Sequence, residues 1–463
     1  MFESAVYQKR RAELMEQVGS GLILLYGNGE LPINFKANTY PFRQDSTLLY
    51  YAGLKRPNLA LLLDVDEGKT YLCGRDPSLE DVIWMGPQTS LEELARCSAI
   101  NGVLSLSAMA NRLVQAGNRL HFLPPYRCEQ EARLSAWLGI PVEELKANSS
   151  QSLIRAVVAQ RSRKDAREVV EIEKALEVTA SLHLSIMTQQ LAGRKDYELV
   201  EEARFRAALK GCSFAYAPIL TAEGQILHKH HRGELLREGR LLLNDMGAET
   251  ETGYAADITR TFPVSKTFTT QQRELYDIVL QAQEKAIAAC KPGRPFRDVH
   301  LLAATALTEG LKALGLMKGD VEEAVSVGAH ALFFPHGLGH MMGLDVHDME
   351  NLGEDEVGYD ENFRRSEQFG LAYLRLARPL QEGFVVTVEP GLYFIPSLIQ
   401  KWETEKKHAN FICYEAVNQY LDFGGVRIED NILITDSGCK VLGDVNIPKS
   451  VADVEALRRE SLL

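Results

Sequence analysis

The chain has 463 residues, of which 45% are hydrophobic and 25% charged, the balance of a soluble globular protein and not of a disordered or fibrous one. This length predicts two domains. With 51 basic and 63 acidic residues the net charge is −12, so the surface would repel nucleic-acid phosphates, and we expect no nucleic-acid partner.

The cellular context is predicted from what the sequence lacks. No apolar run approaches the 18 residues of a membrane span, so we expect no membrane contact. The first residues are charged and amphipathic and have no apolar core of a secretory signal. The seven cysteines are scattered without a C-x-x-C pair, which is typical of free thiols in a reducing compartment. We therefore expect a cytoplasmic protein.

The first part of the chain alternates short strands, turns and helical stretches. Residues 21–26 read as a buried strand, and apolar runs at 58–65 and 69–73 flank Asp66-Glu67-Gly68, which predicts a hairpin. Around 148–164 the composition turns polar and basic. We place the domain boundary there, giving domains over 1–163 and 164–463.

The second part has an α+β pattern. A long amphipathic helix is predicted after residue 164, with one face formed by Val169, Ile172, Leu176, Thr179, Leu182 and Ile186. Thr269 and Gln272 form a capping box that opens a helix through Ala289. Strand candidates lie at 240–243, 257–264, 384–389 and 426–434.

Four carboxylates stand in or beside these apolar strands: Asp245, Asp257, Glu389 and Glu429. One acid in a strand usually lies on a solvated face. Four in one domain favour a different reading, because buried carboxylates repel one another and lose hydration unless cations neutralise them. A pair of divalent metal ions would meet this need.

Three histidines follow in the segment 333–348: His336, His340 and His347. The first two have the i, i+4 spacing of a zinc-binding helix, but two intervening glycines and the absence of H-E-x-x-H argue against a helix. Loop or extended backbone is expected, so at most one or two of them bind metal.

These motifs together resemble the pita-bread metallopeptidases, and most closely aminopeptidase P and prolidase. The blocks are Asp257-Ile-Thr-Arg-Thr-Phe-Pro263, His336-Gly-Leu-Gly-His340, Asp345-Val-His347-Asp348, Thr387-Val-Glu389-Pro-Gly and Arg427-Ile-Glu429-Asp430. The stretch 40–46 also resembles the amino-terminal domain of aminopeptidase P. The resemblance implies an α+β pita-bread catalytic domain preceded by a smaller α/β amino-terminal domain.

The resemblance also implies a set of metal ligands. The equivalents of Asp257 and Glu429 bridge two metals, that of Asp245 holds one of them, and those of His340 and Glu389 hold the other. The expected cofactors are two divalent ions per chain. Oxygen ligands with a single imidazole suit manganese or cobalt better than a metal that prefers thiolates. The usual activator in the family is manganese.

The remaining site residues come from the same resemblance. His336 and His347 match the family's two active-site histidines that do not bind metal, and His228 matches a third in the substrate pocket. Tyr393 and Arg427 match residues that line the site. His183 is expected to be a core histidine, and His230 and His231 are expected to face solvent.

The expected mechanism uses these residue types. Two cations that share a bridging water lower its pKa and give a hydroxide nucleophile. Glu389 would take the water's proton and deliver it to the departing nitrogen, and His347 would donate to the developing oxyanion. An Xaa-Pro bond has no N–H, so shape and His336 would have to hold the proline ring.

The leading hypothesis is a Xaa-Pro aminopeptidase that acts on proline-containing peptides, and the alternative is a prolidase that cleaves only Xaa-Pro dipeptides. The stretch 40–46 favours the aminopeptidase, whereas the inserts 349–381 and 398–423 could narrow the site, act as lids, make oligomer contacts or be solvated surface. A non-catalytic pita-bread binding protein is disfavoured because every ligand is present. By analogy with the family we expect a homo-oligomer, a dimer or a tetramer.

Overall fold

The structure is a computed structural model that describes residues 1–229 and 233–461. His230 and His231, expected to face solvent, lie outside the described residues. The chain divides into two compact units. The amino-terminal unit comprises Met1–Arg161 with Met349–Glu356, and the carboxy-terminal unit comprises Ser162–Asp348 with Val357–Leu463.

The amino-terminal unit is built on a five-stranded mixed sheet in the order β6-β5-β4-β1-β7. Its strands, including the separate β2–β3 pair, are β1 (Leu22–Tyr26), β2 (Pro32–Phe35), β3 (Asn38–Thr39), β4 (Ala60–Asp64), β5 (Lys69–Gly74), β6 (Gly102–Ser105) and β7 (Leu120–Phe122). Its helices are α1 (Ser4–Val18), α2 (Ser46–Ala52), α3 (Leu79–Met85), α4 (Leu91–Cys97), α5 (Leu106–Ala116), α6 (Cys128–Leu138), α7 (Val142–Leu145) and α8 (Gln151–Ser162). The predicted hairpin is confirmed, because β4 and β5 pair antiparallel with Asp64 opposite Lys69.

The core of this unit covers both faces of the sheet. Leu24 and Leu62 of one face pack with Met109 of α5 and Leu134 of α6. On the other side α2 lies against β1 and β4, and α4 lies against β5. Apolar residues on both sides of each central strand therefore explain why these strands read as continuous hydrophobic runs.

The carboxy-terminal unit has longer helices and several short sheets. Its helices are α9 (Ala166–Met187), α10 (Asp196–Leu209), α11 (Thr270–Ala289), α12 (Phe296–Ala313), α13 (Val321–Ser326), α15 (Pro396–Thr404), α16 (Tyr414–Val417) and α17 (Val451–Glu460). Helix α14 (Glu354–Gly358) begins in the segment Met349–Glu356 of the amino-terminal unit and ends in this one. Its strands are β8 (Ser213–Phe214), β9 (Ile219–Thr221), β10 (Leu241–Met246), β11 (Ala248–Glu249), β12 (Ile258–Pro263), β13 (Val385–Val388), β14 (Gly391–Tyr393), β15 (Gly425–Arg427), β16 (Asp430–Ile434) and β17 (Cys439–Val441). This mixture of helices and antiparallel strands confirms the predicted α+β class.

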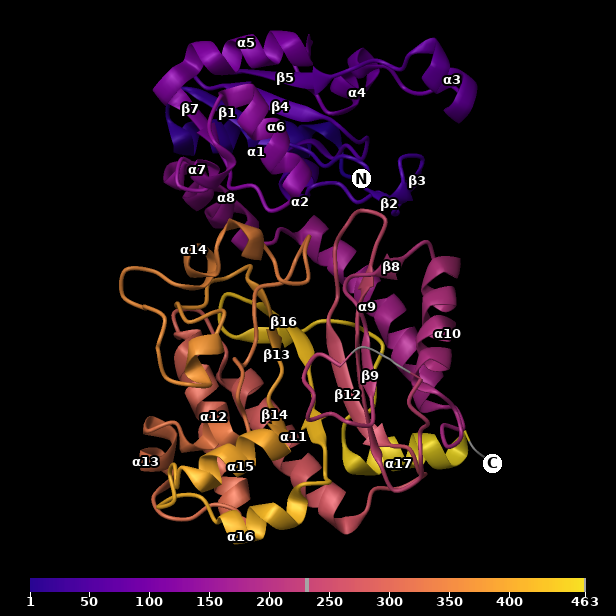
Figure 1. Ribbon diagram of the computed structural model, residues 1–463, viewed down its shortest axis with the longest axis vertical. Helices are drawn as coiled ribbons and strands as arrows, with labels where there is room; N and C mark the ends of the chain where they lie inside the picture. The colour runs from indigo at the N-terminus through magenta and orange to yellow at the C-terminus, as the bar shows by residue number, and fades with distance from the viewer. Residues whose placement is uncertain (230–232, 462–463) are drawn as a thin grey trace. The chain divides into compact units, whose positions relative to one another are not determined.

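Apart from the separate β8–β11 pair, the strands form two groups that meet in the middle of the unit (Figure 1). The first is the antiparallel sheet β12-β10-β9, against which α9 packs, and the second combines β13-β16-β17 with β14-β15, against which α11 packs. The two groups touch where β12 contacts β15 and β16. Residues far apart in sequence are brought together at this junction.

Local sequence signals place the helices correctly. The predicted apolar face of α9 is buried at Ile172, Leu176, Thr179, Leu182 and Ile186, whereas Val169, its first member, is only half-buried. The Thr269–Gln272 capping box opens α11, which ends at Ala289 as expected. His183 is a core histidine, with Nε2 3.2 Å from the Met246 carbonyl and Nδ1 3.0 Å from Asn244 Nδ2.

One strand expectation is wrong in detail. The stretch 426–434 does not form one strand but two, β15 and β16, with Ile428 and Glu429 between them. Arg427 pairs with Gly391 of β14, whereas Asp430 pairs with Val388 of β13. The chain changes partner strands at this point.

Among the described helices, none combines the length and the apolar character needed to cross a membrane.

Candidate metal centre

Two acids meet where the strand groups touch. Asp257 directly precedes β12, and Glu429 lies between β15 and β16. The Glu429 amide donates to the Thr259 carbonyl at 3.1 Å. Asn431 accepts from the Asp257 amide at 3.0 Å and donates to the Asp257 carbonyl at 2.6 Å. These bonds fix the backbone on both sides, so the two side chains face each other.

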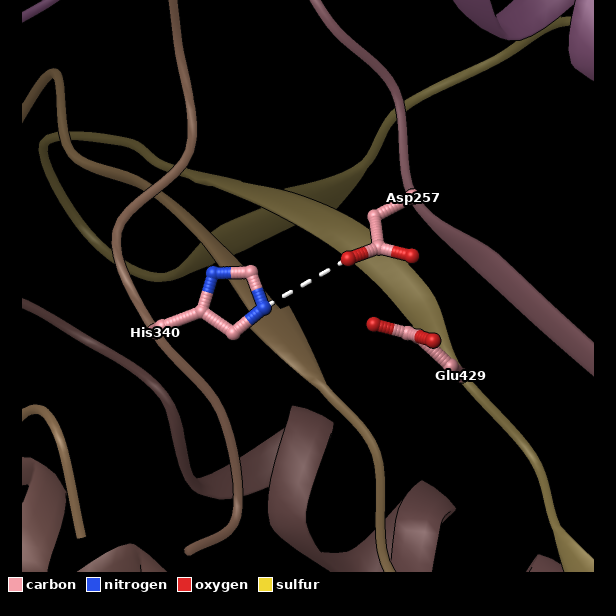
Figure 2. A group of neighbouring side chains, drawn as sticks. All are labelled: Asp257, His340 and Glu429. Carbon is pink, nitrogen blue, oxygen red and sulfur yellow. Dashed lines mark ion pairs between the residues drawn. The ribbon is translucent and has the colours of Figure 1, made fainter. Parts of the chain in front are cut away.

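His340 approaches the same point from a loop. Its amide donates to the Thr387 hydroxyl at 3.0 Å, and its carbonyl accepts from the Thr387 amide at 3.0 Å. Nδ1 lies 3.1 Å from the Met341 carbonyl, so Nδ1 carries the proton and Nε2 presents its lone pair. Nε2 is 3.4 Å from Asp257 Oδ2 (Figure 2). One ligand atom each from Asp257, His340 and Glu429 lies within 4.8 Å of the others.

The other two predicted ligands stand beside this trio. Asp245 lies on β10, and Tyr216 links it to Asp257, since the tyrosine hydroxyl is 2.6 Å from Asp245 Oδ1 and also bonds Asp257 Oδ1. Glu389 follows β13, and its Oε1 is 3.6 Å from His340 Nε2. The structure thus brings all five together, and the four acids Asp245, Asp257, Glu389 and Glu429 are named the carboxylate cluster below.

The electrostatics of the cluster are those of acids without enough counter-charge. Burial raises the pKa of Asp257 to about 7, and the charge of Asp245 adds to the shift. Burial also raises the pKa of Glu389 to about 7, with a further contribution from Asp257. The pKa of Glu429 is raised well above its ordinary value by burial and by Asp257. Each shift means that a negative charge is unfavourable there without a cation.

The donor set fits divalent cations. Oε2 of Glu429 accepts from the Thr259 hydroxyl at 2.6 Å, but Oε1 is buried and has no hydrogen-bond partner among the described residues. The single Tyr216 proton can serve only one of the two carboxylates that it contacts. Buried carboxylate oxygens with one imidazole nitrogen are the ligands that manganese and similar hard or borderline cations prefer.

Arg427, Tyr393 and His336 form a hydrogen-bonded row beside the cluster. Arg427 Nη2 donates to Asp245, and Nη1 donates to the Tyr393 hydroxyl at 3.0 Å. That hydroxyl lies 2.9 Å from His336 Nε2, and His336 Nδ1 lies 2.8 Å from the Gly337 carbonyl. Nδ1 is therefore the donor and Nε2 accepts from Tyr393. Burial lowers the pKa of His336 to about 3, and the charge of Arg427 adds to this, so the ring is neutral.

The two remaining predicted histidines lie at the same site. His347 is half-buried, and its ring centroid is 4.1 Å from that of His340. His228 is exposed, and its pKa is lowered by partial desolvation and by the nearby charge of Arg427. The charges of Asp245 and His347 also influence the pKa of His228, so His228 lies within electrostatic range of the cluster.

Sequence reasoning missed several residues that support the site. Thr259 and Thr387 each occupy a buried strand position, and a hydroxyl beside an acid in an apolar strand was the signal for them. Tyr216 gave no local signal. Arg375 lies in the insert 349–381, and its charge helps to lower the pKa values of His228 and His336.

Two family models match this chain, one over each of its two parts. The family model described as metallopeptidase family M24 matches residues 170–436. The model described as the aminopeptidase P N-terminal domain matches residues 7–121.

Similar proteins match over nearly the whole length. A probable Xaa-Pro aminopeptidase of Fusarium vanettenii is 32% identical, with 98% of this chain and 96% of the relative covered. One of Paracoccidioides brasiliensis is also 32% identical, with 99% and 97% covered. The solved aminopeptidase P of Escherichia coli with the inhibitor Pro-Leu is 28% identical with a TM-score of 0.80, covering 100% of this chain and 99% of that one. The structure of Pseudomonas aeruginosa aminopeptidase PepP is 27% identical with a TM-score of 0.81 and the same coverage.

Proposed function

The chain belongs to metallopeptidase family M24, with the aminopeptidase P fold, and we propose that it hydrolyses the Xaa-Pro bond at the amino terminus of peptides. The observation that carries this proposal is the buried carboxylate cluster around His340. The relatives of this chain that are named as probable Xaa-Pro aminopeptidases match almost its entire length, which supports the same reaction here.

The proposed cofactors are two divalent cations per chain, manganese by preference. Asp245, Asp257, His340, Glu389 and Glu429 would hold them. When bound, such ions act as Lewis acids that acidify water and polarise a carbonyl. The raised pKa values of Asp257 and Glu389 support this assignment, because a bound cation would offset the burial and the repulsion between acids that raise them.

The chain's own residues would handle the protons. Glu389 would take a proton from the attacking water as its oxygen bonds the scissile carbonyl carbon. The carbon–nitrogen bond then breaks, and Glu389 would return the proton to the proline nitrogen. His347, beside His340, would donate a hydrogen bond to the oxyanion of the tetrahedral intermediate.

Four further residues would hold the substrate. His228 is exposed and within range of the cluster, which suits a residue at the pocket entrance. Tyr393 and Arg427 are buried beside the cluster and would form the wall of the site. Both His336 nitrogens have protein partners, so His336 would hold the proline ring by contact and shape.

The experiment is a length series on the metal-loaded enzyme. We expect the tripeptide Gly-Pro-Ala to be cleaved to glycine and Pro-Ala with a higher kcat/KM than the dipeptide Gly-Pro, while Gly-Ala-Ala is not cleaved. Cleavage of the dipeptide alone would indicate a prolidase. If the metal-loaded protein cleaves neither peptide, the proposal is contradicted and the hypothesis of a non-catalytic binding protein is favoured.

We further propose a cytoplasmic homo-oligomer, a dimer or a tetramer. The free state of all seven cysteines suits a reducing compartment. Helix α3 buries none of its residues, and Leu79, Ile83, Trp84 and Met85 are between 70% and 77% exposed. Such an apolar patch is typical of an association surface. Light scattering of Trp84→Ser against the wild type tests this, and a monomeric wild type would contradict it.

A further inference from the structure

The loop that carries His347 ends at a buried ion pair that the proposed reaction does not use. Lys164 Nζ donates to Asp348 Oδ2 at 2.9 Å, and each side chain is 1% exposed. Asp348 is the residue after His347. Lys164 lies two residues before α9, 184 positions away in the sequence.

This loop is held by turns and single contacts and is not part of a helix or a sheet. Between Gly343 and Asp348 it forms neither helix nor strand. The Gly343 amide donates to the Asp345 carbonyl at 3.0 Å, and the Asp348 amide donates to the Met341 carbonyl at 2.9 Å. Because such a turn can shift more readily than a ladder of strands, a side-chain contact at its end has a large effect on its position.

The ion pair also packs directly on the loop backbone. A Cβ added at Gly343 would lie 2.6 Å from Asp348 Oδ2 and 2.7 Å from Lys164 Cε. The side chains of Lys164 and Asp348 therefore fill the space next to Gly343, the first residue of the loop, and Asp348 is its last residue. Movement of either charge would displace the loop at both ends.

Lys164 bonds a second catalytic element through its backbone. Its amide donates to the Gly383 carbonyl at 2.7 Å, and Gly383 precedes β13, the strand that leads to Glu389. One residue thus contacts both the loop of the proposed oxyanion donor and the strand of the proposed proton carrier.

We propose that Lys164 is a positioning residue, which through Asp348 holds His347 at the distance from Glu389 that the reaction needs. The inference rests on the role proposed above for His347. A buried pair of charges is not a general source of stability, whereas a small displacement of a catalytic group lowers the rate by up to about a hundredfold.

The test is a double-mutant cycle on the metal-loaded enzyme with Gly-Pro-Ala as the substrate. Lys164→Met is expected to lower kcat by about 10- to 100-fold, with KM within about threefold and metal content unchanged. In a His347→Ala background, the same substitution is expected to cause no further loss. The matched control is Lys440→Met, since Lys440 forms an ion pair of 2.8 Å with Glu173 on the surface and should leave kcat unchanged.

The possible outcomes are distinct. Unchanged kcat in Lys164→Met, or an equal loss with and without His347, would overturn the inference while leaving the proposed function intact. Full activity of His347→Ala would contradict the proposed role of His347, and the inference with it. If Lys164→Met does not fold, Lys164→Gln, which keeps a donor toward Asp348, is carried through the same cycle and judged by the same results.

Discussion

Glu429 and Asp430 are neighbours in the chain and equally buried, yet they belong to opposite kinds of environment. Glu429 is part of the carboxylate cluster, where burial and Asp257 raise its pKa. Asp430 lies among cations, with Oδ1 2.6 Å from Arg260 and Oδ2 2.8 Å from Lys449 and 2.9 Å from Gln283. Although burial alone would raise its pKa, Arg260 and Lys449 lower it.

The difference between these two regions lies in the partners and not in the residue type or burial. The protein supplies Asp430 with its own counter-charges, so that carboxylate is complete without a ligand. At Glu429, Oε1 is buried without a hydrogen-bond partner among the described residues, so a cation would complete that region. Unmatched buried charge thus separates a site from a structural support, and four experiments test this distinction.

The largest effect is expected from Glu429→Gln. Loss of this proposed metal ligand should lower kcat/KM by at least about a thousandfold, equal to about 4 kcal/mol of transition-state stabilisation. The metal-free variant should be at least as stable as metal-free wild type, because one repelling carboxylate is gone. Metal analysis, kinetics and calorimetry on one preparation check this. Normal metal content with normal rates would place the cation elsewhere.

Asp430→Asn should have the opposite profile. Arg260 and Lys449 would lose a buried partner, so the free energy of unfolding should fall by about 3 kcal/mol. Metal content and kcat per folded chain should stay close to wild type. Denaturant titration together with metal analysis measures both, and Lys440→Met provides an exposed ion pair for comparison, expected to change stability by less than about 1 kcal/mol. Loss of metal in Asp430→Asn would erase the distinction between the two regions.

The metal-free protein should become less stable as pH rises. The folded-state pKa values of Asp257 and Glu389 are raised to about 7 from 3.8 and 4.5, so the folded state binds more protons than the unfolded state in between. The stabilisation is complete below the unfolded values and is lost toward pH 7. For one such group the loss is about 2 kcal/mol between pH 5.5 and 7.

Thermal unfolding after chelation, at a series of pH values, provides the measurement. The metal-loaded enzyme should show the reverse trend, because protons compete with metal as pH falls. A metal-free protein whose melting temperature is flat or rises over this range would show that the cluster is not short of positive charge.

The smallest effect is expected from Tyr393→Phe. This change removes the hydroxyl between His336 and Arg427 but leaves the pairing of Arg427 with Asp245. We expect a loss of about 1 kcal/mol in stability and about tenfold in kcat, measured against wild type at equal metal content. A loss as large as that of Glu429→Gln would mean that the row beside the cluster is part of it.

The features predicted correctly from sequence are those with local causes. The capping box of α11, the apolar face of α9 and the hairpin of β4 and β5 each depend on residues within a few positions of one another. The four acids of the site could also be predicted, because several carboxylates in or beside apolar strands of one domain are an unusual pattern that does not depend on how the strands pair. The resemblance to aminopeptidase P is confirmed by the family and structural matches.

The features missed depend on tertiary contacts. Tyr216 contacts two acids that lie 29 and 41 residues away. The Lys164–Asp348 pair spans 184 residues. The break between β15 and β16 arises because the two halves pair with different strands, which their own alternation does not reveal. The roles assigned to the site residues stay predictions.

The order of Glu429 and Asp430 makes this segment sensitive to length as well as to composition. Successive side chains along extended backbone point to opposite sides. Deleting one residue between Arg427 and Glu429 would slip the register, turning a glutamate toward Arg260 and Lys449 and an aspartate toward His340. Both acids would still be present after such a deletion, but each side chain would point toward the wrong set of partners. The number of residues in this segment is therefore constrained as tightly as the identity of its two acids.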